Sequence, residues 1–121
     1  MPTVIVADDS MFQRFTLSKM LKDMDFEIME AKNGQECLDI IAGQAPDVIL
    51  LDLNMPARNG FEILEELQSR KMNIPTIVIS ADIQESSKKR CLDMGAKAVL
   101  GKPVSQENLA AILNELSLYN A

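Results

Sequence analysis

The chain has 121 residues, 47% of them hydrophobic, which is enough for one ordinary hydrophobic core and too few for two. Its net charge of −6 disfavours direct nucleic-acid binding, and the absence of histidine excludes a His-based metal site, a Ser-His-Asp triad and a histidine phosphocarrier. No apolar run is long enough to span a membrane, and the first residues lack the basic region of a signal peptide. We therefore expect a cytoplasmic protein in which Cys37 and Cys91 are buried, reduced thiols.

Apolar and amphipathic runs alternate along the first half of the chain. Continuous apolar runs predict strands, and apolar residues at helical spacing predict helices. The predicted elements are a strand at Thr3–Ala7, a helix at Met11–Met24 with Leu17, Met20, Leu21 and Met24 on its buried face, a weaker strand at Phe26–Glu30, a helix after Asn33-Gly34 that carries Cys37, Leu38 and Ile41, and a strand at Asp47–Leu53. The last run is apolar almost throughout, which is typical of a strand buried on both faces.

The second half of the chain continues the same alternation. Its predicted elements are a loop at Asn54–Gly60, a helix with Phe61, Ile63, Leu64 and Leu67, a strand at Thr76–Ser80, a polar helix at Gln84–Met94, a strand at Lys97–Gly101, and a last helix with Ser105 as N-cap and Leu109, Ile112, Leu113 and Leu116 as its buried stripe. Five strands in strict alternation with five helices predict an α/β fold, a doubly wound parallel sheet that uses residues 1–121 as one domain.

Polar residues lie at or just after the end of every predicted strand, and Glu30, at the end of the second, would lie toward one edge of the sheet. The other four strands supply the residues of interest. These residues are Asp8 and Asp9, Asp52, Ser80 and Lys102. Taken singly, each has an ordinary structural interpretation as a helix cap, a turn residue or a surface lysine. The carboxyl ends of parallel strands meet at one rim, however, so the fold would bring three carboxylates, a hydroxyl and an ammonium together.

Such a rim favours phosphoryl chemistry. Three close carboxylates repel one another strongly unless a divalent cation lies among them, and hard oxygen ligands suit Mg²⁺ (or Mn²⁺). Asp52 would then be a nucleophile that forms an acyl phosphate, with a second positive charge from Lys102 and a hydrogen bond from Ser80.

The sequence resembles the receiver domains of response regulators, the CheY-like family, and in particular their stand-alone single-domain type. The resemblance covers residues 3–118. The matching motifs are Val6-Ala7-Asp8-Asp9-Ser10 followed by Arg14, Leu51-Asp52-Leu53-Asn54-Met55-Pro56 with Gly60, Ile79-Ser80-Ala81, Gly95-Ala96 and Gly101-Lys102-Pro103. The resemblance implies a strand order of 2-1-3-4-5 and a signalling switch rather than an enzyme.

The resemblance also implies a metal site. Asp8 and Asp9 correspond to the acid pair that binds Mg²⁺, with Asp9 as the more direct ligand and Asp8 acting partly through water. Asp52 corresponds to the phosphoacceptor, which shares the metal, and Asn54 to the residue that offers its backbone carbonyl to it.

The remaining roles concern the switch and its partners. Ser80 resembles the switch hydroxyl, Lys102 the phosphate-binding lysine, and the Lys102-Pro103 bond the cis peptide of the family. The phosphoryl donor is expected to be a phosphohistidine on a sensor histidine kinase or a histidine phosphotransfer protein. Phosphorylation would alter the surface of the fourth helix and fifth strand, which a downstream target protein reads, for example in chemotaxis. We expect a monomer or weak dimer, with no nucleic-acid or membrane partner.

Two features depart from the usual pattern. Val99 stands three residues before the lysine, where many family members have Tyr or Phe, so an aromatic gate at this switch position is absent. In the first helix, Phe15 lies nearly opposite the predicted buried face and Phe12 lies well off it. These two aromatics indicate a partner-docking surface, unless they fold over neighbouring side chains.

Three alternatives remain at this point. The chain could be a phosphate sink or relay intermediate, or a pseudo-receiver that binds a partner without being phosphorylated. It could also be a haloacid-dehalogenase-like phosphatase, which uses a strand-end aspartate as nucleophile. That enzyme needs a second acid two residues later as general acid and base, and Asn54 occupies that position.

Overall fold

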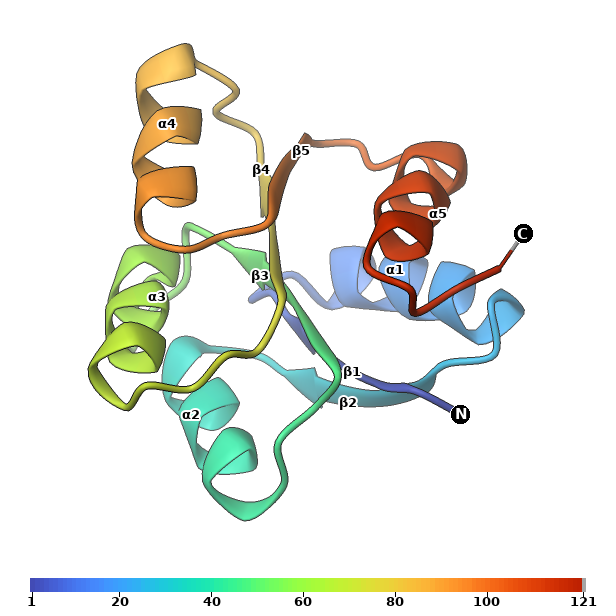
Figure 1. Ribbon diagram of the computed structural model, residues 1–121, viewed down its shortest axis with the longest axis horizontal. Coiled ribbons are helices and arrows are strands. Elements are labelled where there is room, and N and C mark those ends of the chain that lie inside the picture. Colours follow the sequence, from blue (N-terminus) through green and yellow to red (C-terminus); the bar gives the residue numbers. More distant parts are fainter. Residues whose placement is uncertain (121) are drawn as a thin grey trace.

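Five strands alternate with five helices, and the structure, a computed structural model, describes residues 1–120. The strands are β1 (Thr3–Ala7), β2 (Glu27–Ala31), β3 (Val48–Asp52), β4 (Thr76–Ser80) and β5 (Ala98–Gly101). The helices are α1 (Met11–Asp23), α2 (Gly34–Gly43), α3 (Gly60–Ser69), α4 (Glu85–Asp93) and α5 (Gln106–Glu115). All strand pairs are parallel, in the order β2-β1-β3-β4-β5 (Figure 1), which confirms the predicted doubly wound sheet.

The boundaries differ from the sequence predictions by one residue at several ends. β2 begins at Glu27 rather than at Phe26, because the chain first has to reverse after α1. Asp25 has a φ of 64°, and the N–H of Phe26 donates to the carbonyl of Leu21 at 3.0 Å. Phe26 is therefore buried against the end of α1 instead of forming a rung of the sheet. β2 also ends one residue later than predicted, at Ala31. The ranges predicted for α1, β3, α4 and β5 are each too long by one or two residues, the usual difference at element ends.

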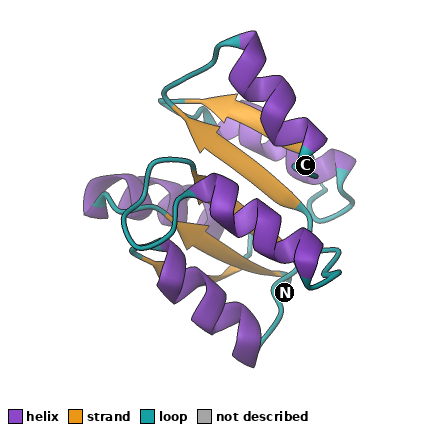
Figure 2. Cartoon of the chain, turned by 90° about the vertical axis from the view of Figure 1, so that its left-hand side faces the viewer, coloured by secondary structure: helices purple, strands orange, loops and turns teal. Residues whose placement is uncertain are grey.

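The sheet separates two hydrophobic clusters, with α2, α3 and α4 on one face and α1 and α5 on the other (Figures 1 and 2). The first cluster includes Cys37, Leu38, Ile41, Ile63, Leu64 and Cys91. The second includes Leu17, Leu21, Leu109 and Leu113. Met20, Ile112 and Leu116, which the sequence places on buried faces, are only partly buried because they lie at the edge of the second cluster. Both cysteines are free and buried, as expected.

Helix α4 is anchored less firmly than the others. Cys91 is its only buried residue, which agrees with the sparse apolar pattern of this segment. The guanidinium of Arg90 lies over the ring of Phe61 in α3, 3.8 Å from its centroid. Gln84, at the start of α4, makes no side-chain capping bond. Each of the other four helices begins with a side chain that accepts a hydrogen bond from its first turn, namely Ser10, Asn33, Asn59 or Ser105.

None of the helices described within residues 1–120 has the length and apolar character needed to cross a bilayer.

Candidate phosphoacceptor site

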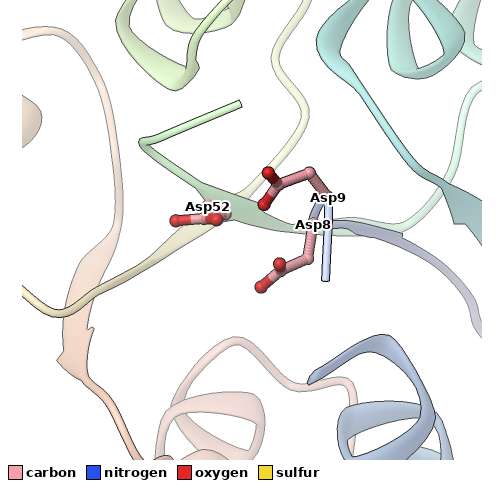
Figure 3. A group of neighbouring side chains, drawn as sticks. All are labelled: Asp8, Asp9 and Asp52. Carbon is pink, nitrogen blue, oxygen red and sulfur yellow. The ribbon is translucent and has the colours of Figure 1, made fainter. Parts of the chain in front are cut away.

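Three carboxylates meet where β1 and β3 end. Ala7 pairs with Leu51 in the sheet, so the chain leaves the two strands side by side at Asp8 and Asp52. Oxygen atoms of Asp8, Asp9 and Asp52 lie within 4.8 Å of one another (Figure 3). Asp8 and Asp52 are only 1% and 4% exposed, whereas Asp9 is exposed. The rim predicted from the sequence therefore exists, with two of its three acids removed from solvent.

Few groups compensate this negative charge. The Nζ of Lys102 lies 3.4 Å from Oδ2 of Asp8 and 3.4 Å from Oδ2 of Asp52. The backbone N–H of Ser10 donates to Oδ1 of Asp8 at 2.9 Å, and that of Asn54 donates to Oδ1 of Asp52 at 3.3 Å. Oδ2 of Asp8 is buried and accepts no hydrogen bond from any residue described. One ammonium thus faces two buried carboxylates and a third at their edge.

The pKa of Asp52 reflects this shortage of positive charge. Burial raises that pKa above its ordinary value of 3.8, and the charge of Asp8 raises it further. Lys102 and the N–H of Asn54 lower it, but they do not cancel the two raising effects. A buried carboxylate oxygen that accepts no hydrogen bond and a set of hard oxygen donors fit a divalent cation such as Mg²⁺, which would reduce the repulsion among these carboxylates.

The hydroxyl and the lysine predicted for this rim come from the two neighbouring strands. Ser80 ends β4, is fully buried, and pairs with Gly101 at the end of β5. The N–H of Lys102 donates to the carbonyl of Ser80 at 2.9 Å, so the two residues are held next to each other. The Lys102-Pro103 bond is cis, as the family resemblance implied. Val99 is half-buried in β5 and packs against the first hydrophobic cluster.

The loop after β3 is compact, which keeps Asp52 at a fixed distance from α3. The N–H of Gly60 donates to the carbonyl of Leu53 at 2.9 Å. A Cβ atom on Gly60 would lie 2.8 Å from the carbonyl oxygen of Asp52, so only glycine allows the helix to begin this close to the strand. Within the loop, Arg58 has a φ of 95°, which is strained for a residue with a side chain, and Asn54 is exposed.

The whole arrangement matches a known family. The chain matches the response regulator receiver domain family over residues 4–114. It belongs to that family. Protein PilH of Pseudomonas aeruginosa is 31% identical over 116 residues, which cover 94% of this chain and 96% of PilH. Response regulator MprA of Mycolicibacterium vanbaalenii is 34% identical over 113 residues, 93% of this chain and 49% of MprA, so the chain spans about half the length of that relative.

Solved structures agree with this assignment. The structure of the CheX-CheY-BeF3-Mg complex from Borrelia burgdorferi includes a chain with a TM-score of 0.90 and 27% identity; the match covers 95% of this chain and 88% of that one. The chain is thus a response regulator receiver domain of two-component signalling, as the sequence motifs indicated.

Arg14 has a role in this receiver domain that the sequence did not disclose. Its Nη1 donates to the carbonyl of Asp8 at 2.6 Å, and its Nε donates to Oε1 of Glu30 at 3.2 Å. Arg14 therefore ties α1 to the ends of β1 and β2 and holds the backbone of the acid pair. Its recurrence in the family motif was the available signal, but spacing alone did not say which carbonyl it would reach.

The two aromatics of α1 are exposed in the receiver domain. Phe12 and Phe15 are each 69% exposed, and the neighbouring Met11 is 76% exposed. A groove of about 430 Å³, lined in part by Met11, Lys22 and Ile28, runs along one side of Phe15. A second groove of about 300 Å³ runs along its other side. The aromatics are therefore not covered by neighbouring side chains, and Phe15 lines both grooves.

Proposed function

We propose that this receiver domain is a phosphorylation-dependent switch in which Asp52 accepts a phosphoryl group from a phosphohistidine. The observation that carries the proposal is the contact of one ammonium, that of Lys102, with the buried carboxylates of both Asp8 and Asp52. Membership of the receiver family supports a sensor histidine kinase or a histidine phosphotransfer protein as the donor.

The transfer needs an ionised Asp52. A carboxylate oxygen of Asp52 forms the new bond to phosphorus while the phosphorus–nitrogen bond of the phosphohistidine breaks, and the leaving imidazole nitrogen keeps the electron pair. Lys102 favours the ionised form of Asp52 and places positive charge where the phosphoryl oxygens arrive. The hydroxyl of Ser80 donates a hydrogen bond to one of these oxygens after transfer.

Asp8, Asp9, Asp52 and the backbone carbonyl of Asn54 would hold Mg²⁺ (or Mn²⁺), which when bound neutralises the carboxylates and draws charge from a phosphoryl oxygen. Arg14 contributes by fixing the backbone carbonyl of Asp8, which orients the acid pair without contacting the phosphoryl group.

The domain acts as a switch rather than as a phosphatase. A phosphatase of this kind needs a second acid two residues after the nucleophile to activate water. That position is Asn54, whose side chain is an amide and whose backbone N–H donates to Asp52. The output is a change of the α4–β5 surface that a downstream target protein reads. We propose a cytoplasmic, monomeric or weakly dimeric protein in a chemotaxis-type pathway, with a phosphate sink or relay intermediate as the second candidate. A direct role in nucleic-acid binding is disfavoured by the net charge of −6.

Acetyl phosphate tests the proposal without requiring the natural donor. Incubation with Mg²⁺ should add about 80 Da to the intact mass, the increment of one phosphoryl group. Asp52→Asn should abolish the adduct. A protein with no adduct would be a pseudo-receiver, and repeated turnover of small phosphomonoesters would make it a phosphatase.

The exposed aromatics of α1 are proposed as the docking surface for the phosphohistidine donor. Phe15→Ala should slow transfer from the cognate donor at least about tenfold, because an exposed aromatic in an interface centre commonly contributes more than one factor of ten in affinity. Its reaction with acetyl phosphate should not change. Leu92→Ala is the matched control, since Leu92 is an exposed apolar residue on α4, across the sheet. Equal transfer rates for Phe15→Ala and wild type would contradict this assignment.

A further inference from the structure

A chain of hydrogen bonds connects the buried hydroxyl of the site with helix α4. The backbone N–H of Asp82 donates to Oγ of Ser80 at 3.0 Å. The carboxylate of the same Asp82 accepts from the hydroxyl of Ser87 at 2.7 Å and from the N–H of Gln84 at 3.0 Å. Ser87 lies in the first turn of α4. Asp82 thus contacts the switch residue with its backbone and the helix with its side chain.

This bridge replaces the capping bond that α4 otherwise lacks. Gln84 makes no side-chain cap, whereas the carboxylate of Asp82 reaches both Gln84 and Ser87. An acid at this end also complements the positive end of the helix dipole. These two donors lower the pKa of Asp82, so its carboxylate is charged at neutral pH. Because Cys91 is the only buried residue of α4, the bridge adds hydrogen bonds at the start of a helix that few buried side chains hold.

A second contact holds the same loop against the site. A Cβ atom on Gly101 would lie only 2.8 Å from Cγ2 of Ile83, so Ile83 rests directly on the end of β5. Gly101 pairs with Ser80 and precedes Lys102. The segment between β4 and α4 therefore contacts Ser80 and Gly101 at one end, and at the other end it is hydrogen-bonded to the first turn of α4.

We propose that Asp82 is the positioning residue that couples the Ser80 hydroxyl to helix α4. When the side chain of Ser80 rotates so that its hydroxyl donates to a phosphoryl oxygen, its Oγ moves away from the N–H of Asp82. The loop between β4 and α4 and the first turn of α4 then lose this hydrogen bond to the site. This route needs no aromatic side chain, which fits a chain with Val99 at the usual aromatic position. The phosphoryl trigger rests on the proposed function, whereas the coupling between Ser80 and α4 exists in the resting protein and is tested there.

A double-mutant cycle in the metal-free protein measures the coupling. The readout is hydrogen exchange of the Lys88 amide, which donates to the carbonyl of Gln84 in the first turn of α4. Ser80→Ala and Ser87→Ala should each accelerate this exchange about fivefold, the effect of losing one typical hydrogen bond. Together they should accelerate it by about the same fivefold, because either change already breaks the path from Ser80 through Asp82 to Ser87. Independent effects would multiply to about 25-fold and would overturn the proposal.

Two further variants sharpen the cycle. Ser86→Ala is the matched control, because Ser86 is an exposed serine in the same turn and shares the helix-propensity change of Ser87→Ala. Its effect should multiply with that of Ser80→Ala. Asp82→Ala removes the bonds to both Gln84 and Ser87 and should accelerate exchange at least as much as the double variant. Wild-type exchange in Asp82→Ala would also overturn the proposal.

An experiment with a phosphoryl mimic tests this coupling separately from the proposed function. With Mg²⁺ and beryllofluoride, a phosphoryl mimic, amide NMR shifts of wild type should change at Asn54 and along α4. In Asp82→Ala the change at Asn54 should persist, while the change along α4 should fall by at least about half. An unchanged α4 response in Asp82→Ala refutes the coupling. No response at Asn54 in wild type refutes Asp52 as phosphoacceptor, and the exchange cycle then decides the coupling alone.

Discussion

The Nζ of Lys102 lies 3.4 Å from Oδ2 of Asp52, and it is the only side-chain cation within ion-pair distance of the buried acids among residues 1–120. This ammonium both pairs with the acids and repels any second cation placed between them. Replacing Lys102 should therefore affect metal binding and phosphoryl transfer in opposite directions.

Lys102→Ala should bind Mg²⁺ more tightly than wild type but take phosphate from acetyl phosphate at least about tenfold more slowly. Binding improves because a positive charge leaves the metal's surroundings, and transfer slows because charge stabilisation of the phosphoryl oxygens is lost. Mg²⁺ titration and a phosphorylation time course measure the two quantities. Lys97→Ala, at an exposed lysine just before β5, should change neither. Weaker Mg²⁺ binding in Lys102→Ala would contradict the repulsion.

The raised pKa of Asp52 predicts that the stability of the metal-free protein falls as the pH rises. The folded protein keeps the Asp52 proton at pH values where the unfolded chain has lost it, so the free energy of unfolding falls as the pH rises from the ordinary value of 3.8 through the raised pKa. Without Mg²⁺ at pH 7, Asp52→Asn should therefore be more stable than wild type by more than about 0.5 kcal/mol, the usual scatter of neutral substitutions.

Urea unfolding in EDTA at several pH values checks this expectation. The advantage of Asp52→Asn should shrink as the pH falls from the raised pKa of Asp52 toward the ordinary value of 3.8, and it should be lost below 3.8, because Asp52 is then protonated in both states of the wild type. Saturating Mg²⁺ should stabilise wild type more than the variant. A variant less stable than wild type throughout the range would rule out an uncompensated charge at this site.

Two glycines of α2 should respond oppositely to the same change. A Cβ atom on Gly34 would overlap the carbonyl oxygen of Arg58, whereas a Cβ atom on Gly43 would meet nothing within 4 Å. Gly34→Ala should destabilise the fold by about 2 kcal/mol, a typical cost of overpacking, and should disturb the loop that carries Asn54. Gly43→Ala should be neutral or stabilising by up to about 1 kcal/mol. Denaturant unfolding compares them, and similar losses of stability would show that the packing against Arg58 is loose.

The thiol of Cys37 should be inert in the native protein. Burial raises its pKa to about 12, so almost no thiolate forms at neutral pH, and Cys91 is fully buried as well. Iodoacetamide at pH 8 should label neither cysteine until the chain unfolds, and the labelling rate should rise in parallel with unfolding in urea. Rapid labelling of Cys37 in the folded protein, read by mass spectrometry, would show that this part of the first cluster opens readily.

The sequence predicted the fold and the chemistry of the rim because both depend on local patterns. Apolar runs marked the strands, and parallel topology made the residues after them into neighbours. The sequence did not indicate that Asp82 and Arg14 connect the site to its surroundings, because each acts through a backbone group. Asp82 offers its N–H to Ser80, and Arg14 donates to the carbonyl of Asp8. Backbone groups are the same at every position, so only the folded chain shows which of them a side chain reaches.

The two-sided core has a consequence for the order of events in signalling. Helix α1, with Phe12 and Phe15, lies on one face of the sheet, and α4 lies on the other (Figure 1). If α1 receives the donor and α4 presents the signal, the two partners approach from opposite directions and do not compete for space. A target could then bind before the donor departs, and we would expect a complex of donor, receiver domain and target to be able to form.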